Sequence, residues 1–299
     1  MRVLATQRLP GPAWDELHDV EIGTLDVTHE DAEALVAPGV PIDDEVLDRL
    51  PSLKVIANYG VGYDQVDVDA CRARGVAVTN TPGAVDAATA ELAFALLLAV
   101  RRRVVEGHEH VTAGRWDTGW AQPPFLGRQV AGSTLGIIGL GRIGRAVAQR
   151  AQAFEMRILY HQRTKLDGSA FEYRALDDLM GEADVVSVHA PLTPETKGLV
   201  TREHLALMRD GAALVNTARG GLVDEDALVA QLVSGRISAG LDVFVYEPSV
   251  PDELFTLPNV VLTPHLGSGT VETRAAMTRL VVDNLLAAER GEPLVTPVL

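Results

Sequence analysis

Short apolar runs alternate with amphipathic stretches along most of the chain. In the first eighty residues the pattern predicts helices at 42–50 and 66–74, and strands at 3–6, 34–37, 55–58 and 76–79. Later apolar runs predict strands at 135–138, 157–161, 184–188, 212–216, 238–243 and 260–262. Strands that alternate with helices are typical of parallel sheets with right-handed crossovers. The pattern therefore predicts an α/β fold with one complete α/β unit ahead of residue 134.

Two longer helices and one irregular connector complete the pattern. Residues 84–103 are rich in Ala and Leu and apolar on all sides, which predicts a buried helix that ends in Arg101-Arg102-Arg103, a solvated run. Residues 269–290 predict a last helix, placed beyond the final strand, that returns to the first unit. Residues 114–132 contain two Trp and several Pro and Gly, which predicts an irregular connector.

A glycine-rich turn lies between a predicted strand and a predicted helix. It reads Gly139-x-Gly141-x-x-Gly144, and a second strand follows at 157–161. In a dinucleotide-binding turn the first glycine allows the tight turn, the second lets the backbone approach a pyrophosphate, and the third lets helix pack against strand. The motif alone also fits an ordinary glycine turn, but the order of strand, glycines, helix and strand favours a dinucleotide site.

Composition narrows the class of protein. The net charge of −15 argues against a nucleic-acid partner, because phosphate binding is driven by Lys and Arg. One cysteine, Cys71, cannot form an internal disulfide. The N-terminus lacks the pattern of a signal peptide, and the longest apolar run, 92–100, is too short to span a membrane. We expect a soluble cytoplasmic protein without a metal site.

Three charged or titratable residues follow the late strands. Arg219, Glu247 and His265 each lie just beyond a predicted strand, where open α/β sheets bind ligands. Singly they fit a surface ion-pair residue, a solvated loop charge and a helix cap. Together they supply a carboxylate clamp, a partner for a proton donor and the donor itself. The set predicts chemistry on a small carboxylic acid beside the dinucleotide.

At these residues the chain resembles the D-isomer-specific 2-hydroxyacid dehydrogenases, and most of all their glyoxylate/hydroxypyruvate reductase branch. The motifs that carry the resemblance are Asn58-Tyr59-Gly60-Val61-Gly62-Tyr63-Asp64, Val78-Thr79-Asn80-Thr81-Pro82-Gly83, Gly139-Leu140-Gly141-Arg142-Ile143-Gly144, Asn216 to Gly221, Asp242 to Pro248 and Thr263 to Ser268. The resemblance implies two doubly wound parallel-sheet domains. A Rossmann cofactor domain at 99–267 would be inserted into a flavodoxin-like substrate domain formed by 1–98 and 268–299.

The resemblance also implies roles for the candidate residues. Arg219 would bind the substrate carboxylate and polarise its carbonyl, and His265 would be the general acid in reduction. Glu247 would hydrogen-bond His265, and a neighbouring carboxylate favours the imidazolium form. Val61 and Gly62 would offer backbone N–H groups to the substrate carboxylate. The expected reaction is reduction of a small 2-oxo acid by NAD(P)H.

The implied cofactor contacts come from every loop at the carboxyl edge of the second sheet. They are Thr89, Gly139, Gly141, Arg142, Ile143, Gly144, Gln162, Arg163, Thr164, Lys165, Pro191, Thr217, Ala218, Arg219, Asp242, His265 and Gly267. Asp242 would hold the nicotinamide carboxamide.

Cofactor preference is read from the loop after strand 157–161. NAD-specific folds place a carboxylate there for the ribose 2′-OH, but no carboxylate occurs before Asp167. Arg163 and Lys165 favour a 2′-phosphate and thus NADP, with Thr164 as a further donor. The alternative is a basic loop that tolerates both cofactors.

Two tryptophans and the family resemblance predict a homodimer. Exposed Trp116 and Trp120 would be costly on a monomer, and Trp120 is implied to reach the partner's active site. Simple core packing of these side chains is the alternative. A phosphoglycerate dehydrogenase-like enzyme and a non-catalytic dinucleotide-sensing protein, like the corepressors of this superfamily, also remain open. Both would be expected to carry extensions that are not evident in this sequence.

Overall fold

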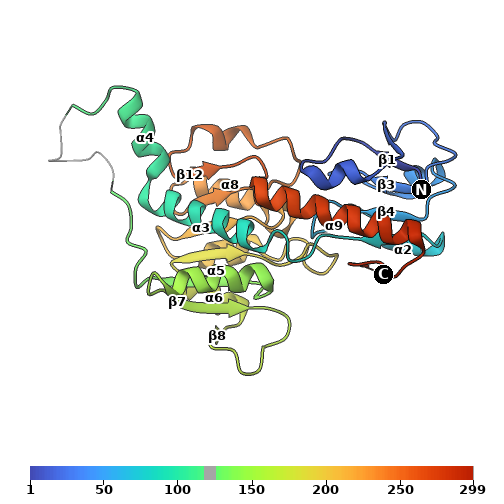
Figure 1. Cartoon of the computed structure of the whole chain (residues 1–299). Coiled ribbons are helices and arrows are strands. Elements are labelled where there is room, and N and C mark those ends of the chain that lie inside the picture. Colours follow the sequence, from blue (N-terminus) through green and yellow to red (C-terminus); the bar gives the residue numbers. More distant parts are fainter. Residues whose placement is uncertain (118–125, 299) are drawn as a thin grey trace. The chain divides into compact units, whose positions relative to one another are not determined.

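The computed structural model describes residues 1–117 and 126–298, which divide into two compact units (Figure 1). The first unit is Met1–Asp86 with Ser268–Leu299, and the second is Ala87–Gly267. The first boundary between the units therefore lies between Asp86 and Ala87, whereas the expected boundary lies between residues 98 and 99. The reason is that Ala90, Ala93, Phe94 and Leu97 of helix α3 (Asp86–Arg102) are packed in a core of the second unit.

The first unit is a five-stranded parallel sheet. Its strands are β1 (Val3–Ala5), β2 (Val20–Ile22), β3 (Ala34–Val36), β4 (Val55–Ala57) and β5 (Ala77–Thr79). The order β2-β1-β3-β4-β5 is that of flavodoxin-like folds, as expected. Strand β2 is absent from the predicted set because its three edge residues are at most partly buried and give no continuous apolar signal.

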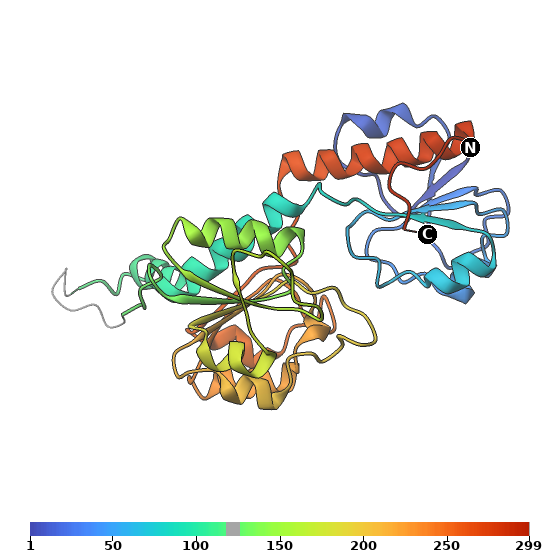
Figure 2. The ribbon, with the colours of Figure 1, turned by 90° about the horizontal axis from the view of Figure 1, so that it is seen from below.

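Helices cover both faces of this sheet, as Figure 2 shows. On one side lie α1 (Asp44–Asp48) and α2 (Val68–Ala73), whose Leu47 and Cys71 join the core. On the other lie the 3₁₀ turn η1 (Pro12–Glu16) and α9 (Val271–Arg290). The last helix therefore returns to the first unit, as the sequence predicts.

The second unit is a seven-stranded, entirely parallel sheet. Its strands are β6 (Thr134–Ile138), β7 (Arg157–His161), β8 (Glu172–Tyr173), β9 (Val185–Val188), β10 (Ala213–Asn216), β11 (Ser238–Leu241) and β12 (Val260–Leu262). The order β12-β11-β10-β9-β6-β7-β8 is the Rossmann order with β6 as first strand and β12 added at one edge. From β6 the chain adds strands β7 and β8 toward one edge of the sheet, and from β9 it adds strands toward the other edge. Such folds bind dinucleotides at this switch point between β6 and β9.

A hydrophobic core lies on each face of this sheet. Helices α3 and α5 (Arg142–Gln152) pack on one face, and α6 (Leu176–Glu182), α7 (Arg202–Leu207) and α8 (Glu225–Val233) pack on the other. Two short 3₁₀ turns, η2 (Gly220–Leu222) and η3 (Asp252–Thr256), complete the unit. Within the described residues no helix is long and apolar enough to cross a membrane.

The arginine run at the end of α3 corrects one expectation. Arg102 is exposed, but Arg101 is only 7% exposed and donates to the carbonyls of Gly211 (3.2 Å) and Gln129 (3.0 Å). Burial lowers the pKa of Arg101. The predicted solvated helix end is therefore wrong for Arg101, because its backbone-carbonyl partners are distant in sequence. After Arg103 the unpredicted helix α4 (Val104–Thr112) follows.

Candidate active site

The three glycines of the turn after β6 occupy three different environments. Gly139 has a φ of +96°, and a Cβ there would lie 2.7 Å from the Ala190 nitrogen. A Cβ on Gly144 would lie 2.2 Å from the Gly139 carbonyl oxygen, so α5 packs directly on the turn. Gly141, at the start of α5, has no atom within 4 Å of its Cβ position. The turn therefore leaves the helix N-terminus open, which fits a dinucleotide pyrophosphate.

The loop after β7 presents the basic residues expected to read the cofactor. Arg163, Thr164 and Lys165 are exposed, whereas Tyr160 is fully buried beneath them. The Leu166 N–H donates to the Tyr160 hydroxyl (3.0 Å), which holds the loop to the strand. The Thr193 hydroxyl and, to a smaller degree, the charge of Arg163 lower the pKa of Glu195.

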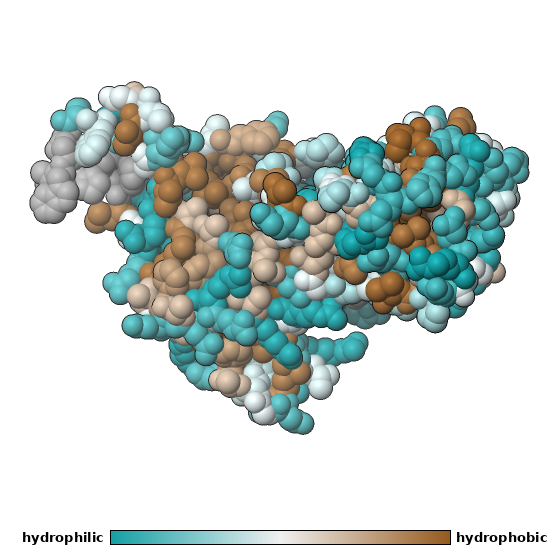
Figure 3. Space-filling view, in the orientation of Figure 1, coloured by the Kyte–Doolittle hydropathy of each residue, from teal (hydrophilic) through white to brown (hydrophobic). Residues whose placement is uncertain are grey.

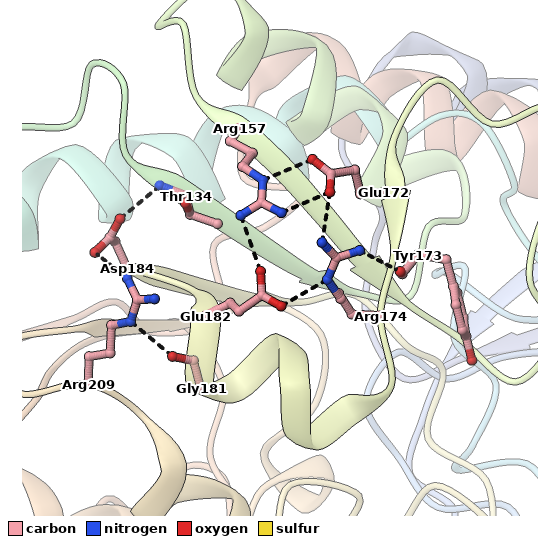
Figure 4. A network of polar contacts seen from close by, with 9 residues as sticks. All are labelled: Thr134, Arg157, Glu172, Tyr173, Arg174, Gly181, Glu182, Asp184 and Arg209. Atoms are coloured by element: carbon pink, nitrogen blue, oxygen red, sulfur yellow. Dashed lines mark hydrogen bonds and ion pairs between the residues drawn. The ribbon is translucent and has the colours of Figure 1, made fainter.

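A ring of four charged residues fixes the return of this loop to the sheet (Figure 4). Arg157 donates two hydrogen bonds to Glu172 (both 2.8 Å) and one to Glu182 (3.1 Å). Arg174 donates to Glu182 (2.9 Å) and Glu172 (2.8 Å). These bonds, those of Arg157 first, lower the pKa of Glu172 to about 2. The ring links the start of β7, β8 and the end of α6, and so anchors the end of the loop at 162–171, where the chain enters β8.

Glu247 and His265 form a hydrogen-bonded pair. His265 Nδ1 lies 2.7 Å from Glu247 Oε2, and the Phe244 N–H donates to Oε1 (3.0 Å). Burial raises the pKa of Glu247, but the bonds from His265 and Phe244 and the charges of His265 and Arg219 outweigh it, so the net shift is downward. Because Nδ1 faces the carboxylate and the imidazole is 48% exposed, Nε2 is the nitrogen available to a ligand.

Asp242 supports the loop that carries His265. Its Oδ1 accepts from the Thr263 hydroxyl (2.6 Å) and the Leu266 N–H (2.7 Å), and Oδ2 accepts from the Gly267 N–H (2.8 Å). The residue is 0% exposed, and burial raises the pKa of its carboxyl. Its backbone carbonyl also accepts from the His265 N–H (2.9 Å) and supports the left-handed φ of +53° at His265. These contacts show that Asp242 holds the loop that carries His265. Its predicted contact with the nicotinamide carboxamide stays a prediction.

Arg219 is set by the loop after β10. The buried Asn216 donates to the Arg219 carbonyl (2.8 Å) and accepts from the Ala218 N–H (3.0 Å). The next residue, Gly220, has no room for a side chain, because a Cβ would lie 2.1 Å from the Phe244 carbonyl carbon. The loops that bear Arg219 and Glu247 therefore pack backbone to backbone. The charge of Arg219 also helps to lower the pKa of Glu247, so Arg219 lies near the Glu247–His265 pair, and the roles of the three residues stay a prediction.

The other predicted site residues differ in whether they already have a hydrogen-bond partner and in which unit they lie. The Thr217 hydroxyl is buried and has no hydrogen-bond partner within residues 1–117 and 126–298, which fits a contact to a bound cofactor. Thr89 donates to the Gly267 carbonyl (3.0 Å). Val61 and Gly62 lie in the first unit, after β4. Trp120 lies outside the described residues. Nowhere in the part of the chain that the structure describes do three potential metal ligands gather.

Asn216, which a family motif contains without an assigned role, and Tyr160, which lies outside the motifs, also shape these loops. Asn216 and Tyr160 end or belong to apolar strands, and their polar atoms bond backbone groups of the next loop. A polar residue at the carboxyl end of a buried strand is the one signal available for Asn216. Tyr160 gives no such signal because tyrosine is common in strand cores.

Known proteins resemble this chain along nearly its whole length. Residues 94–267 match the D-isomer specific 2-hydroxyacid dehydrogenase family, NAD binding domain. A glyoxylate reductase of Pyrococcus furiosus is 47% identical over 93% of this chain and 86% of its own length. The crystal structure of the TT0316 protein from Thermus thermophilus is 48% identical, with a TM-score of 0.93 and full coverage of both chains. An NADPH-dependent glyoxylate/hydroxypyruvate reductase from Sinorhizobium meliloti, solved with NADP and malonate, is 37% identical with a TM-score of 0.91 over 99% of this chain and 96% of that chain.

Proposed function

This chain belongs to the D-isomer-specific 2-hydroxyacid dehydrogenases, and we propose that it reduces glyoxylate and hydroxypyruvate to the corresponding 2-hydroxy acids, of D configuration where chiral, with NAD(P)H. The observation that carries the proposal is the grouping of Arg219 with the Glu247–His265 pair in the unit that bears the open glycine turn. The names of the relatives support the same substrate class.

Each residue of the site has one role in the reduction of the 2-oxo acid. Bound NAD(P)H supplies a hydride to the carbonyl carbon. Arg219 binds the substrate carboxylate through its planar guanidinium and polarises the carbonyl, with the Val61 and Gly62 N–H groups as further donors. His265 donates the proton from Nε2 to the carbonyl oxygen, and Glu247 stabilises its imidazolium form. Hydride and proton together convert the 2-oxo acid to the 2-hydroxy acid.

A substrate panel tests this activity. Purified protein is assayed at 340 nm with glyoxylate, hydroxypyruvate, pyruvate and phosphohydroxypyruvate, each with NADPH and NADH. We expect the first two to give the highest kcat/KM. A clear preference for phosphohydroxypyruvate would indicate a phosphoglycerate dehydrogenase-like enzyme. Tight dinucleotide binding without turnover would indicate a sensing protein instead.

Replacing Glu247 with glutamine is expected to move the pH profile of reduction. The reaction needs the proton that His265 Nε2 donates to the carbonyl oxygen. The lowered pKa keeps Glu247 ionised at neutral pH, where it stabilises the imidazolium. Without that charge the fall in kcat should occur at lower pH. The check is kcat against pH for both proteins, and superimposable profiles would contradict the role of Glu247.

We place the preference for NADP in the loop after β7. Arg163 and Lys165 are exposed on a loop that the Tyr160 hydroxyl holds through the Leu166 N–H, and this loop has no carboxylate before Asp167. In Arg163→Ala we expect kcat/KM for NADPH to fall about ten- to a hundredfold, with NADH little changed, because charge-assisted bonds to a phosphate are lost. Arg202→Ala, which removes an exposed arginine at the start of α7, is the matched control. Equal losses with both cofactors would refute this assignment.

We also propose a homodimer that forms through α3 and α4. None of the α4 residues is buried, and Val104 and Val111 are more than half exposed. Figure 3 shows apolar side chains gathered over α3, where Leu92 and Leu98 are only partly buried. An apolar band of this kind is typical of interfaces.

Light scattering tests the dimer. Wild type should have twice the mass of the chain, and Val104→Glu with Val111→Glu should shift it toward the monomer. Val233→Glu, on α8, replaces an equally exposed valine as a control. A monomeric wild type would contradict the proposal, and with it the predicted reach of Trp120 into the partner's site.

A further inference from the structure

Two asparagine amides bind three successive carbonyl groups in the loop after β4. Asn58 Nδ2 donates to the carbonyls of Gly60 (3.0 Å) and Gly62 (2.9 Å). Asn80 Nδ2 donates to the carbonyl between them, that of Val61 (2.9 Å). The Thr81 N–H adds a second bond to the Gly60 carbonyl (3.0 Å). The carbonyl oxygens of Gly60, Val61 and Gly62 therefore all face the side-chain amides of the two asparagines.

Binding these carbonyls also orients the N–H groups of the same peptides. In a trans peptide the carbonyl of one residue and the N–H of the next point in opposite directions. The peptides of this loop are trans, since the cis bond recorded in the described chain is Glu247–Pro248. Fixing the Gly60 carbonyl therefore fixes the Val61 N–H, and fixing the Val61 carbonyl fixes the Gly62 N–H. Both N–H groups point away from the amides that hold their peptides.

The asparagines are themselves held by the rest of the first unit. The Asn80 N–H donates to the Thr296 carbonyl (3.2 Å), and the Asn80 carbonyl accepts from the Thr296 hydroxyl (2.6 Å). Asn284 of α9 binds Thr296 in turn (2.8 and 3.0 Å). Tyr59, next to Asn58, is buried and donates its hydroxyl to the Arg274 carbonyl (3.0 Å). The loop is therefore prearranged by the fold before any ligand binds.

We propose that Asn58 and Asn80 are positioning residues, which act through the backbone of Val61 and Gly62 to hold two N–H donors ready for the substrate carboxylate. The inference rests on the proposed function, which places the substrate carboxylate at these N–H groups. Without the Asn80 amide, the Val61 carbonyl oxygen can turn toward the carboxylate, and the negative end of its dipole would then face the negative charge. Without the Asn58 amide, the Gly60 carbonyl keeps its bond from the Thr81 N–H, so the effect on the Val61 N–H should be smaller. We therefore expect weaker binding of the substrate carboxylate. The rate of proton donation should not change, because His265 is not part of this loop.

Steady-state kinetics of Asn80→Ala and Asn58→Ala test the inference. We expect KM for glyoxylate to rise about tenfold in Asn80→Ala, the scale of one hydrogen bond to a charged group. The rise should be smaller in Asn58→Ala, because the Thr81 N–H still binds the Gly60 carbonyl. kcat should stay within about twofold, and KM for NADPH should not change. Asn80→Ser keeps a donor and should fall between wild type and Asn80→Ala. It also serves as the readout if the alanine variant fails to fold.

Asn259→Ala is the matched control. The Asn259 amide likewise donates to two carbonyls, those of Leu232 (3.0 Å) and Ile237 (2.8 Å), in the other unit. It should lower Tm to a similar extent and leave KM for glyoxylate unchanged. An unchanged KM in Asn80→Ala and Asn58→Ala, or the same rise in Asn259→Ala, would overturn the positioning role alone. A wild type that reduces no 2-oxo acid would overturn the proposed function and this inference with it.

Discussion

Replacing His265 with alanine is expected to lower kcat for glyoxylate reduction by about 10²–10⁴-fold, because the loss of a general acid typically has this effect. The imidazole is the one group of the trio that can donate a proton at neutral pH. Its Nδ1 is engaged by Glu247 at 2.7 Å, which leaves Nε2 for the ligand. The measurement is single-turnover reduction at saturating glyoxylate and NADPH.

The same variant should still bind cofactor, because His265 is only one of the implied cofactor contacts and the open turn at Gly141 does not depend on it. NADPH binding is followed by fluorescence titration. His204→Ala is a matched control, since His204 also pairs with a carboxylate (Asp177, 3.1 Å) in the second unit but lies on α7, away from the trio. Its turnover should equal that of wild type. An unchanged rate in His265→Ala would remove the mechanism.

Placing a methyl group on two glycines of the same turn should have two different consequences. In Gly144→Ala the Cβ would lie 2.2 Å from the Gly139 carbonyl oxygen, so α5 and the turn must move apart. Overpacking of this kind costs about 1–3 kcal/mol or more, and the displaced atom is backbone. We expect Tm to fall by roughly 5 °C or more and NADPH binding to be lost.

In Gly141→Ala the methyl group enters open space, so the fold should be kept. Cofactor affinity should nevertheless fall at least about tenfold, because the methyl group occupies the approach of the pyrophosphate. Thermal melts and NADPH titrations of both variants separate the two effects. A Gly141→Ala protein that binds NADPH as wild type does would show that the pyrophosphate does not approach this glycine.

The order of elements could be predicted because most strands of both sheets are marked by their own apolar run. Strands β7 and β12 lie where the pattern predicts them, and the ends of α3 differ by two residues or fewer. The pattern gave no bounds for the short edge strands β2 and β8, for α4, or for the core-covering helices α6, α7 and α8. Strand β8 has two residues and is held by the charge ring, and α4 buries no residue, so neither leaves an apolar signal.

The sequence by itself determined the fold class, the glycine turn and the candidate residues Arg219, Glu247 and His265, because these depend on local pattern and on family motifs. Only the tertiary structure decided what holds them. Asp242 accepts from three groups of the His265 loop, Gly220 lets the Arg219 loop touch the Phe244 backbone, and Arg101 is buried against carbonyls from distant loops. Each of these contacts joins segments far apart in the chain. A linear pattern records which residues are polar, but their partners are fixed only when the strands take their places in the sheet.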